Sequence, residues 1–392
     1  MSAITAKASR KMKKYAVLTR EPRCFLGSFD FSWEQRKLGE LVDVCSGRDY
    51  KHLSEGTIPV YGTGGYMLSV NDALSYDRDA IGIGRKGTID RPYILKAPFW
   101  TVDTLFYAIP REKVDLNYAF DIFQNIDWKK KDESTGVPSL SKTAINDIDV
   151  LAPKHDEQQI IGQFFAAIDN LITLHQRKFE KLTNVKKSML EKMFPQNGSS
   201  YPEIRFKGFT DPWEQRKLGE IGSVSMCRRI FKEQTSETGD IPFYKIGTFG
   251  AEPDAFISRE LFEEYKSKYP YPKKGDILIS ASGSIGRTVE FAGNNEYFQD
   301  SNIVWLSHDE RLSNSFLKCF YSVVKWAGIE GSTIKRLYND NILNTVICMP
   351  SVPEQEHIGL FFENLDNLIT LHQRELEKLQ NIKKSMLEKM FV

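Results

Sequence analysis

The sequence predicts an α+β fold in which two globular domains are separated by two long antiparallel coiled-coil helices, with a pseudo-twofold internal repeat. Three observations predict it. Matching blocks of sequence open and close each half of the chain. The closing blocks carry apolar residues at heptad spacing, which is typical of paired helices. The stretches between the blocks consist of short β-branched and aromatic runs broken by Gly, Asn, Asp and Pro, which is typical of strands.

Two blocks carry the repeat. Residues 33–40, W-E-Q-R-K-L-G-E, recur letter for letter at 213–220, and residues 157–194 recur at 354–391 with about 28 of 38 positions identical. The stretches between the blocks, which have diverged almost beyond alignment and differ in length by 17 residues, are 41–153 and 221–350. The chain is thus two variable domains, each followed by a nearly identical tail.

The expected organisation has five parts. They are a basic N-terminal extension (1–20), a first globular domain (21–153), a first long helix (154–196), a linker with a second globular domain (197–350) and a second long helix (351–392). Within the domains, runs at 58–61, 106–109, 276–279 and 303–306 predict strands, while 118–128 and 315–326 predict helices. Each domain is therefore expected to be α+β.

Each closing block predicts a helix with an apolar seam. The residues that recur every seven positions along this seam are Ile161, Ile168, His175, Leu182 and Met189 in the first copy and Ile358, Leu365, His372, Leu379 and Met386 in the second. A second series lies four residues after the first and is broken in the first copy at Lys186. No Gly or Pro follows Gly162 within its block, so the helix can extend about 55 Å at 1.5 Å per residue.

Two kinds of polar feature on the helices need an interpretation. We interpret His175 and His372 as hydrogen-bonded polar residues that help to fix the helix register. We interpret the lysine pairs at 186–187 and 383–384 as a solvated face, with phosphate contact as the alternative.

Composition limits the class of protein. With 53 basic and 52 acidic residues the net charge is +1, so any nucleic-acid surface has to be local. No run of about 18 apolar residues occurs and the first residues lack the core of a signal peptide, which predicts a cytoplasmic protein with no membrane association. The segment up to Arg20 carries six basic residues and no acid. We expect a disordered tail there, with a DNA-binding arm as the alternative.

The motifs that suggest an enzyme do not fit their chemistry. Residues 82–87 satisfy G-x-G-x-x-G, but Pro92 and the residues before it cannot open the helix that a dinucleotide site needs, so a strand, a tight turn and a second strand are expected. Asp254, Glu264 and Lys266 spell a nuclease pattern, yet 256–268 resembles a charged amphipathic helix. Six histidines and five cysteines lack ligand spacing. The chain is therefore predicted to be non-catalytic, with no metal site and no cofactor of its own.

Polar and basic residues on predicted loops are the candidates for DNA contact, because Arg, Lys, Ser, Thr and aromatic groups anchor phosphates and read base edges. The candidates in the first domain are Arg48, Lys51, Tyr61, Arg85, Lys86, Lys129, Lys130, Lys131, Ser134 and Thr135. Those in the second domain are Arg228, Arg229, Ser282, Ser284, Arg287, Ser332, Thr333, Lys335, Arg336 and Tyr338. Each residue alone is also compatible with an ordinary solvated surface.

The paired blocks resemble one known family. Each of the two variable domains is opened by W-E-Q-R-K-L-G-E and closed by E-Q-x-x-I-G, followed by D-N-L-I-T-L-H-Q-R and K-K-S-M-L-E-K-M-F. This arrangement looks like the specificity subunit of type I restriction-modification systems. The resemblance covers about residues 21–392. It implies that each variable domain is a target-recognition domain that reads one half of a split, asymmetric sequence in double-stranded DNA, while the helices set the spacing and dock other subunits.

The resemblance also implies partners. These are two copies of a methylation subunit, with motor-nuclease restriction subunits added to the complex, and the partners would bind adenosylmethionine, ATP and Mg²⁺. Two other classes remain open from the residues: a helical scaffold that binds proteins and not DNA, and a self-sufficient nuclease. Sequence-specific DNA binding separates the first from a specificity subunit, and cleavage by the isolated chain separates the second.

Overall fold

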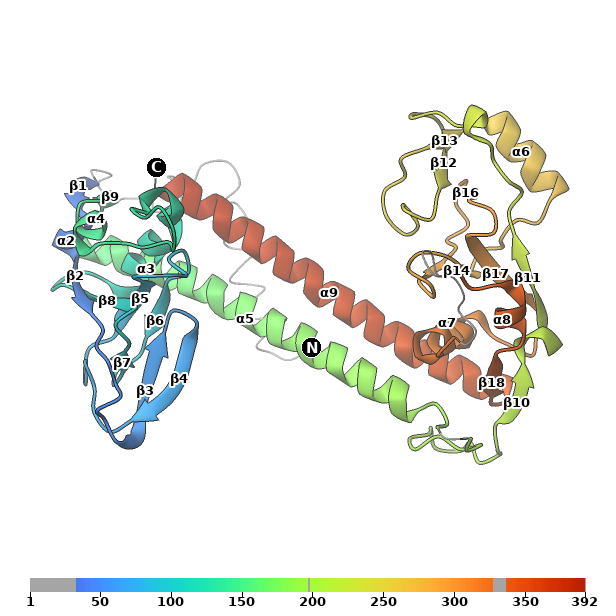
Figure 1. Ribbon diagram of the computed structural model, residues 1–392, viewed down its shortest axis with the longest axis horizontal. Helices are drawn as coiled ribbons and strands as arrows, with labels where there is room; N and C mark the ends of the chain where they lie inside the picture. Colours follow the sequence, from blue (N-terminus) through green and yellow to red (C-terminus); the bar gives the residue numbers. More distant parts are fainter. Residues whose placement is uncertain (1–32, 197, 327–335, 392) are drawn as a thin grey trace. The chain divides into compact units, whose positions relative to one another are not determined.

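The structure, a computed structural model, describes residues 33–196, 198–326 and 336–391. The chain divides into two compact units (Figure 1): residues up to 177 together with those from 373 onward, and residues 178–372. Each unit therefore holds one globular domain, the first part of one long helix and the last part of the other. The predicted N-terminal extension and the candidates Ser332, Thr333 and Lys335 lie outside the described residues.

In the first unit, the globular domain is built on a four-stranded antiparallel sheet in the order β2-β8-β5-β6. Its strands are β2 (Val42–Ser46), β5 (Ala80–Gly84), β6 (Tyr93–Leu95) and β8 (Leu105–Pro110). A second sheet, β4-β3-β7, consists of β3 (Glu55–Gly62), β4 (Gly65–Val70) and β7 (Trp100–Thr101), and β1 (Glu34–Lys37) pairs with β9 (Asp149–Ala152). The short helices are α2 (Leu38–Leu41), α3 (Leu116–Asn125), η2 (Trp128–Lys131) and α4 (Lys142–Asn146).

In the second unit, the four-stranded sheet has the order β11-β17-β14-β15. Its strands are β11 (Gly222–Met226), β14 (Ile277–Ser280), β15 (Thr288–Glu290) and β17 (Ile303–His308). A three-stranded sheet consists of β12 (Ile241–Tyr244), β13 (Phe256–Ile257) and β16 (Tyr297–Phe298), and β10 (Glu214–Lys217) pairs with β18 (Val346–Met349). The short helices are η3 (Leu218–Glu220), η4 (Lys232–Gln234), α6 (Arg259–Lys268), α7 (Asn314–Val323) and α8 (Asn339–Leu343).

The two domains share one topology although their sequences have diverged. β2, β8, β5 and β6 correspond in order and direction to β11, β17, β14 and β15. In both domains the three-stranded sheet contains one parallel pair, β3 with β7 and β12 with β16. The second domain inserts α6, which begins at Arg259 and not at Phe256 as predicted, because residues 256–257 pair as β13 and Ser258 caps the helix. The internal repeat thus extends through the variable domains.

Apolar side chains of the sheet and one helix form the core of each domain. In the first unit, Ile81 and Ile83 of β5 pack with Tyr118, Ile122 and other residues of α3. The cap residue Asp115 accepts a hydrogen bond from the main chain of Tyr118, which explains why α3 begins at Leu116. The second unit repeats this arrangement with α7, whose capping side chain is Ser313.

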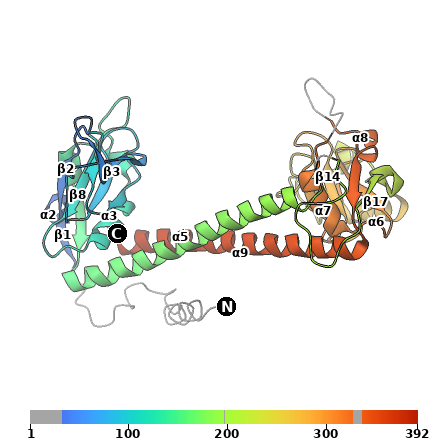
Figure 2. The same ribbon diagram turned by 90° about the horizontal axis from the view of Figure 1, so that it is seen from below.

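The two predicted tails are long helices, α5 (His155–Lys192) and α9 (Val352–Met390), drawn without interruption in Figures 1 and 2. α5 begins in the first unit and ends in the second, and α9 does the reverse. The predicted seam residues are buried or half-buried, including His175 and His372. None of the described helices combines the length and the apolar composition of a membrane span.

The lysines of the closing block pair with aspartates of the opposite helix. Lys186 of α5 lies 2.5 Å from Asp366 of α9 in the second unit, and Lys383 of α9 lies 2.5 Å from Asp169 of α5 in the first. The interpretation of Lys186 and Lys383 as part of a solvated face is therefore wrong. Both lysines occupy the second seam series, so a charge at that position is oriented inward, where it is matched by a carboxylate.

The E-Q-x-x-I-G motif attaches each globular domain to its helix. Gln158 of α5 accepts a hydrogen bond from the main-chain N–H of Asp115, just before α3, and its own amide donates to the Pro153 carbonyl. Gly162 permits the close approach of α3, because a Cβ there would lie 2.4 Å from Asp115 Oδ1. The preceding residue, Glu157, is buried and accepts a hydrogen bond from the Trp33 indole, so the opening and closing blocks meet.

The second unit repeats this attachment with one change. Gln355 accepts from the main chain of Ser313. Buried Glu354 is paired with Arg205 of the linker through two contacts of 2.7 Å. The closing block therefore fixes how each domain is oriented on the start of its own helix.

Candidate nucleic-acid interface

The loops of each domain gather at one end of the four-stranded sheet. In the first domain Ser46, the last residue of β2, pairs with Phe106 near the start of β8, and Gly84, the last residue of β5, pairs with Leu105. In the second domain Met226 pairs with Val304 near the start of β17. Because the strands are antiparallel, the segment before β8 or β17 meets the turn after β5 or β14 and the loop after β2 or β11.

The opposite end of each sheet faces the helix attachment. Pro110, the last residue of β8, pairs with Val42, the first of β2. The chain then continues to Lys113, whose carbonyl contacts the ring of His155 at the start of α5. Each domain is thus anchored to its helix at one end and presents its loops at the other, which is where a macromolecular partner can reach them.

In the first domain, main-chain atoms of residues 101–104 hold the loops together. The Thr101 carbonyl accepts from the N–H of Arg48, and the N–H of Val102 donates to the Tyr61 carbonyl. The Thr104 carbonyl accepts from the N–H groups of Arg85 and Lys86. Two loops that carry predicted DNA-contacting residues, and the end of strand β3 with Tyr61, therefore meet at one segment.

A further loop of the first domain joins this group. The main chain of Leu140 donates to the Arg85 carbonyl at 2.9 Å, and Lys86 forms a β-bridge with Ser139. Asp132 organises this loop by accepting hydrogen bonds from the main chains of Ser134 and Ser139, which hold the pKa of its carboxyl below the usual range. Lys129 lies 2.9 Å from Asp90, in the segment that follows the turn at residues 84–87.

Other candidates of the first domain are less constrained. Lys130 pairs at 3.1 Å with Asp127, the residue that precedes its helix, and Lys51 and Lys131 are exposed. Tyr61 is half-buried, and its ring centroid lies 6.4 Å from that of exposed Tyr66. Ser134 is bound to Asp132, whereas Thr135 is exposed on the same loop.

In the second domain the equivalent segment, residues 299–302, uses side chains for the same purpose. Asp300 pairs with Arg229 at 2.8 Å, and Arg336 donates to the Ser301 hydroxyl at 2.9 Å. Ser282 is buried and its hydroxyl donates to the side chain of Asn302, so it supports the turn after β14 and is not itself exposed.

The other described candidates of the second domain make different contacts. Ser284 and Arg287 are exposed on the turn after β14, and Arg287 also donates to the Gly250 carbonyl at 3.0 Å. Arg228 lies over the ring of Tyr269 at 5.2 Å and is not bound to the 299–302 segment. Tyr338 is half exposed and stacks with the guanidinium of Arg336, whose Cζ lies 5.8 Å from the ring centroid.

Sequence reasoning missed the residues that hold the loops in place. Gln299, Asp300, Ser301 and Asn302 were not among the predicted residues, and neither were residues 101–104. A signal did exist in the second domain, because four consecutive polar residues stand directly before the buried strand β17. In the first domain the corresponding contacts use main-chain atoms, which leave no mark in the side-chain sequence.

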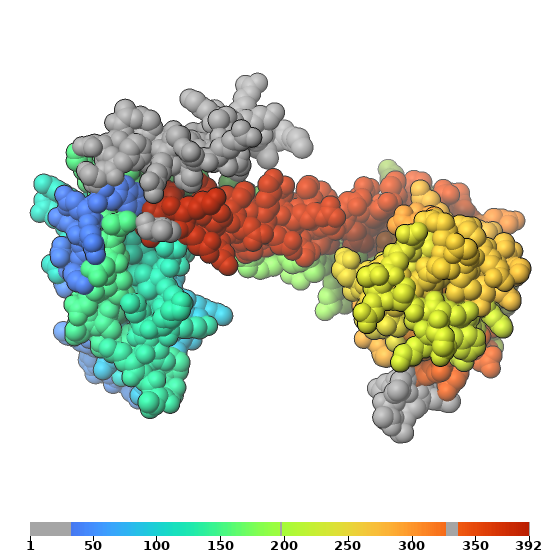
Figure 3. All heavy atoms as spheres, turned by 90° about the horizontal axis from the view of Figure 1, so that it is seen from above, coloured from blue at the N-terminus to red at the C-terminus, as the bar shows by residue number. Residues whose placement is uncertain are grey.

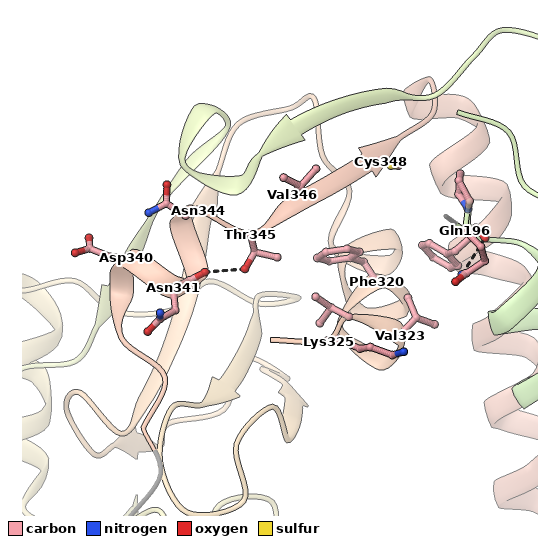
Figure 4. Close-up of a pocket in the computed structure, with 13 residues that line it drawn as sticks. Gln196, Phe320, Val323, Lys325, Asp340, Asn341, Asn344, Thr345, Val346 and Cys348 are labelled. Carbon is pink, nitrogen blue, oxygen red and sulfur yellow. Dashed lines mark hydrogen bonds between the residues drawn. The ribbon is translucent and has the colours of Figure 1, made fainter. Parts of the chain in front are cut away.

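One open cavity of about 660 Å³ lies elsewhere in the second unit, between the end of α5, the end of α7 and the segment from α8 to β18 (Figure 4). Phe320, Val323 and Val346 give it an apolar part, while Asn341 and Thr345 are joined by a 2.7 Å hydrogen bond. None of its lining residues is a predicted DNA-contacting residue. The cavity is therefore separate from the loops that meet at residues 101–104 in the first domain and 299–302 in the second, which we call the loop group of each domain.

The nuclease pattern is not assembled. Asp254 pairs with Lys245 at 2.9 Å, whereas Glu264 pairs with Lys268 of its own helix at 3.0 Å. Within the described residues, no three His, Cys, Asp or Glu side chains are grouped so that they could hold a metal ion. These two carboxylates therefore belong to separate ion pairs.

The sequence matches a family described as the type I restriction modification DNA specificity domain, once at residues 32–184 and again at 210–381. The chain belongs to this family. The two matches coincide with the two copies of the repeat, so each family domain contains one globular domain and part of the long helix that follows it.

Similar proteins carry the same description. The chain is 39% identical to a putative type I restriction enzyme specificity subunit of Haemophilus influenzae, over 80% of this chain and 82% of that protein. It is 23% identical to the MjaIX type I restriction enzyme specificity subunit of Methanocaldococcus jannaschii, over 97% of both chains. The fold is similar to that of the S subunit of a type I restriction-modification system from M. genitalium, with a TM-score of 0.68, 15% identity and coverage of 93% and 98%. The protein is thus a type I specificity subunit, whose role is DNA sequence recognition.

Proposed function

We propose that each globular domain reads one half of a split, asymmetric DNA target. The observation that carries this proposal is that two domains of one topology present loop groups of different sequence. A shared scaffold gives each domain the same way of approaching a duplex, while different loop side chains select different bases. Two identical domains would suit a palindrome, whereas two different ones suit an asymmetric site.

The local charge supports a DNA contact at these loops despite the net charge of +1. The loop group of the first domain carries Arg48, Arg85 and Lys86, and all three are exposed. Exposed cations on loops that a scaffold holds in place are suited to phosphate anchoring, and the polar side chains beside them are suited to base edges.

Exchange of one variable domain tests this function. Residues 41–153 are replaced by the equivalent stretch of a relative, the complex is expressed with its partner subunits, and methylated adenines are mapped in the host genome. We expect one half of the target to change while the other half is retained. The reciprocal exchange of residues 221–350 serves as the control and should change the other half. If either exchange altered both halves, the domains would not act separately.

We further propose that the paired helices set the spacing between the half-sites and dock two methylation subunits, one on each copy of the repeat. Support comes from Leu174 and Leu371, which occupy the same repeat position and are 45% and 52% exposed. One face of α9 is visible in Figure 3, and more than half of the α9 residues are exposed. Two equivalent exposed apolar positions suit two copies of one partner.

The chain itself catalyses no reaction under this proposal. The methylation and restriction subunits then bind adenosylmethionine, ATP and Mg²⁺. The separate ion pairs of Asp254 and Glu264 support this division of labour.

A further inference from the structure

In the second domain, four consecutive side chains each hold a different loop. Gln299 accepts a hydrogen bond from the main chain of Ile246, Asp300 binds Arg229, Ser301 binds Arg336, and Asn302 binds Ser282. Arg336, which stands shortly before α8, and the loops after β11, after β12 and after β14 are therefore fixed relative to one another. Such a polar junction, placed at the loop end of the sheet, can preorganise the side chains that it binds.

Ser301, which forms part of this junction, has an unusual backbone conformation. Its φ angle is +48°, a left-handed conformation that residues with a Cβ rarely adopt. In this conformation both the hydroxyl and the carbonyl of Ser301 lie against one nitrogen of Arg336, at 2.9 and 3.3 Å. Strain of this kind is retained where it serves a function.

Arg336 is half-buried, whereas the other candidate arginines of the second domain, Arg228, Arg229 and Arg287, are exposed. Arg229 is neutralised by Asp300, and Arg287 is bound to the Gly250 carbonyl from an exposed position. Arg336 is half-buried between Ser301 and the Tyr338 ring, and no carboxylate of the described residues forms an ion pair with it. Its described hydrogen bonds use Nη2, so the protein orients the guanidinium without cancelling its charge.

We propose that Arg336 reads a guanine in the half-site of the second domain and that Ser301 positions it. A guanidinium has donors and no acceptor, and guanine presents two adjacent acceptors, N7 and O6, in the major groove. Ser301 binds Nη2 of Arg336, so Nη1 is the nitrogen that would donate to these acceptors. Adenine and cytosine present an amino donor there, which repels the guanidinium. This inference rests on the proposed function of the domain, and it adds the identity of one base and of the side chain that recognises it.

The first experiment maps adenine methylation by complexes that contain Arg336→Ala or Ser301→Gly. Glycine keeps the left-handed backbone and removes the hydroxyl. Arg336→Ala should relax one guanine position of the second half-site and leave the first half-site intact, and Ser301→Gly should relax the same position less. The matched control is Arg311→Ala. Arg311 follows the other end of β17 and binds Asp309 and the Glu220 carbonyl.

The second experiment measures binding of the same complexes to a duplex in which each guanine of the second half-site is replaced in turn by 7-deazaguanine, which lacks N7. The wild-type complex should lose affinity at one position by roughly 5- to 150-fold, and the Arg336→Ala complex should be insensitive there. Such a loss of sensitivity is specific to a direct contact, because general destabilisation would leave the dependence on N7 in place.

The outcomes separate the two proposals. If the wild-type complex methylated without sequence preference, the proposed function would fail. If its target were specific but the second half-site held no guanine, or if Arg336→Ala kept the full dependence on N7, the assignment of Arg336 would be wrong while the proposed function stood. Relaxation of the same position by Arg311→Ala would trace the effect to domain stability and would also overturn the assignment.

Discussion

Asp121 of α3 and Cys319 of α7 correspond in the two units, and each is close to a lysine–aspartate pair of the long helices. Asp121 is 1% exposed, and its Oδ2 has no hydrogen-bond partner among the described residues. Burial raises the pKa of its carboxyl to about 9, against the attraction of Lys383. Cys319 is also buried, and burial raises the pKa of its thiol to about 12. The first unit thus keeps an acid where the second has a neutral group.

This acid predicts a pH dependence of stability. The folded pKa of Asp121 lies above its unfolded value of 3.8, so the folded state binds the proton more tightly. Its contribution is fully present below about pH 4 and is lost as pH rises toward 9, with a slope of up to about 1.4 kcal/mol per pH unit. Asp121→Asn should flatten the fall in stability measured by urea denaturation between pH 5 and 9.

The control for this prediction is Asp90→Asn. Lys129 holds the pKa of the Asp90 carboxyl below its usual range, so Asp90 is already ionised throughout this window. Its replacement should leave the slope unchanged. A slope that stayed the same in Asp121→Asn would mean that the Asp121 carboxyl is ionised in the folded protein.

At the scale of elements, each long helix has an apolar seam that is covered and a second apolar position that is not. Leu368 and Leu371 of α9 are 44% and 52% exposed and lie three residues apart, on neighbouring positions of the helix surface. Leu174 is the equivalent of Leu371 on α5 and is 45% exposed. The seam residues explain why the helices pair, but they do not explain these leucines.

We expect the exposed leucines to hold the methylation subunits. Leu371→Glu or Leu174→Glu should each reduce the stoichiometry from two methylation subunits to one, and the double variant should bind none, as measured by native mass spectrometry of the purified complex. A charge buried in an apolar interface costs several kcal/mol. Leu360→Glu is the control, because Leu360 is 57% exposed and its repeat equivalent is Gln163. Two subunits bound to the double variant would contradict this docking surface.

At the scale of the whole molecule, the two lysine–aspartate pairs mark off equal lengths of the two long helices. They lie 17 residues apart on both helices, from 169 to 186 on α5 and from 366 to 383 on α9. An insertion in one helix would break this match, whereas equal insertions in both would preserve it. The pairs therefore tie the two helix lengths to each other.

Four residues inserted after Arg177 and four after Arg374 should lengthen both helices by about 6 Å. Four residues exceed one turn by about 40°, so the seam can continue as a stutter. We expect the spacer between half-sites to grow by about one or two base pairs at 3.4 Å each, with both half-sites unchanged in a methylation map. Two residues inserted in each helix would rotate the following seam by about 200° and should prevent assembly. If the four-residue variant were fully active and kept the original spacer, the long helices would not set the distance between the half-sites.

Much of this architecture could be predicted from local sequence. The two identical copies of W-E-Q-R-K-L-G-E predicted the internal repeat, and the heptad spacing of apolar residues predicted the long helices. The run of β-branched and aromatic residues at 303–306 predicted a strand. The same reasoning failed at Lys186 and Lys383. From the sequence alone, a lysine pair indicates a solvated face, because nothing in the local pattern shows that an aspartate of the other helix lies against it.

The sequence by itself determined the repeat, the long helices and the family, because each of these depends on the identity and spacing of residues along the chain. Tertiary structure decided the rest. It brought the diverged domains to one topology, since many sequences can fill the same buried sheet. It also gathered loops from distant parts of the chain at residues 101–104 and 299–302. Main-chain hydrogen bonds and a left-handed Ser301 make those junctions, and neither follows from side-chain patterns, because they arise only once the strands have paired.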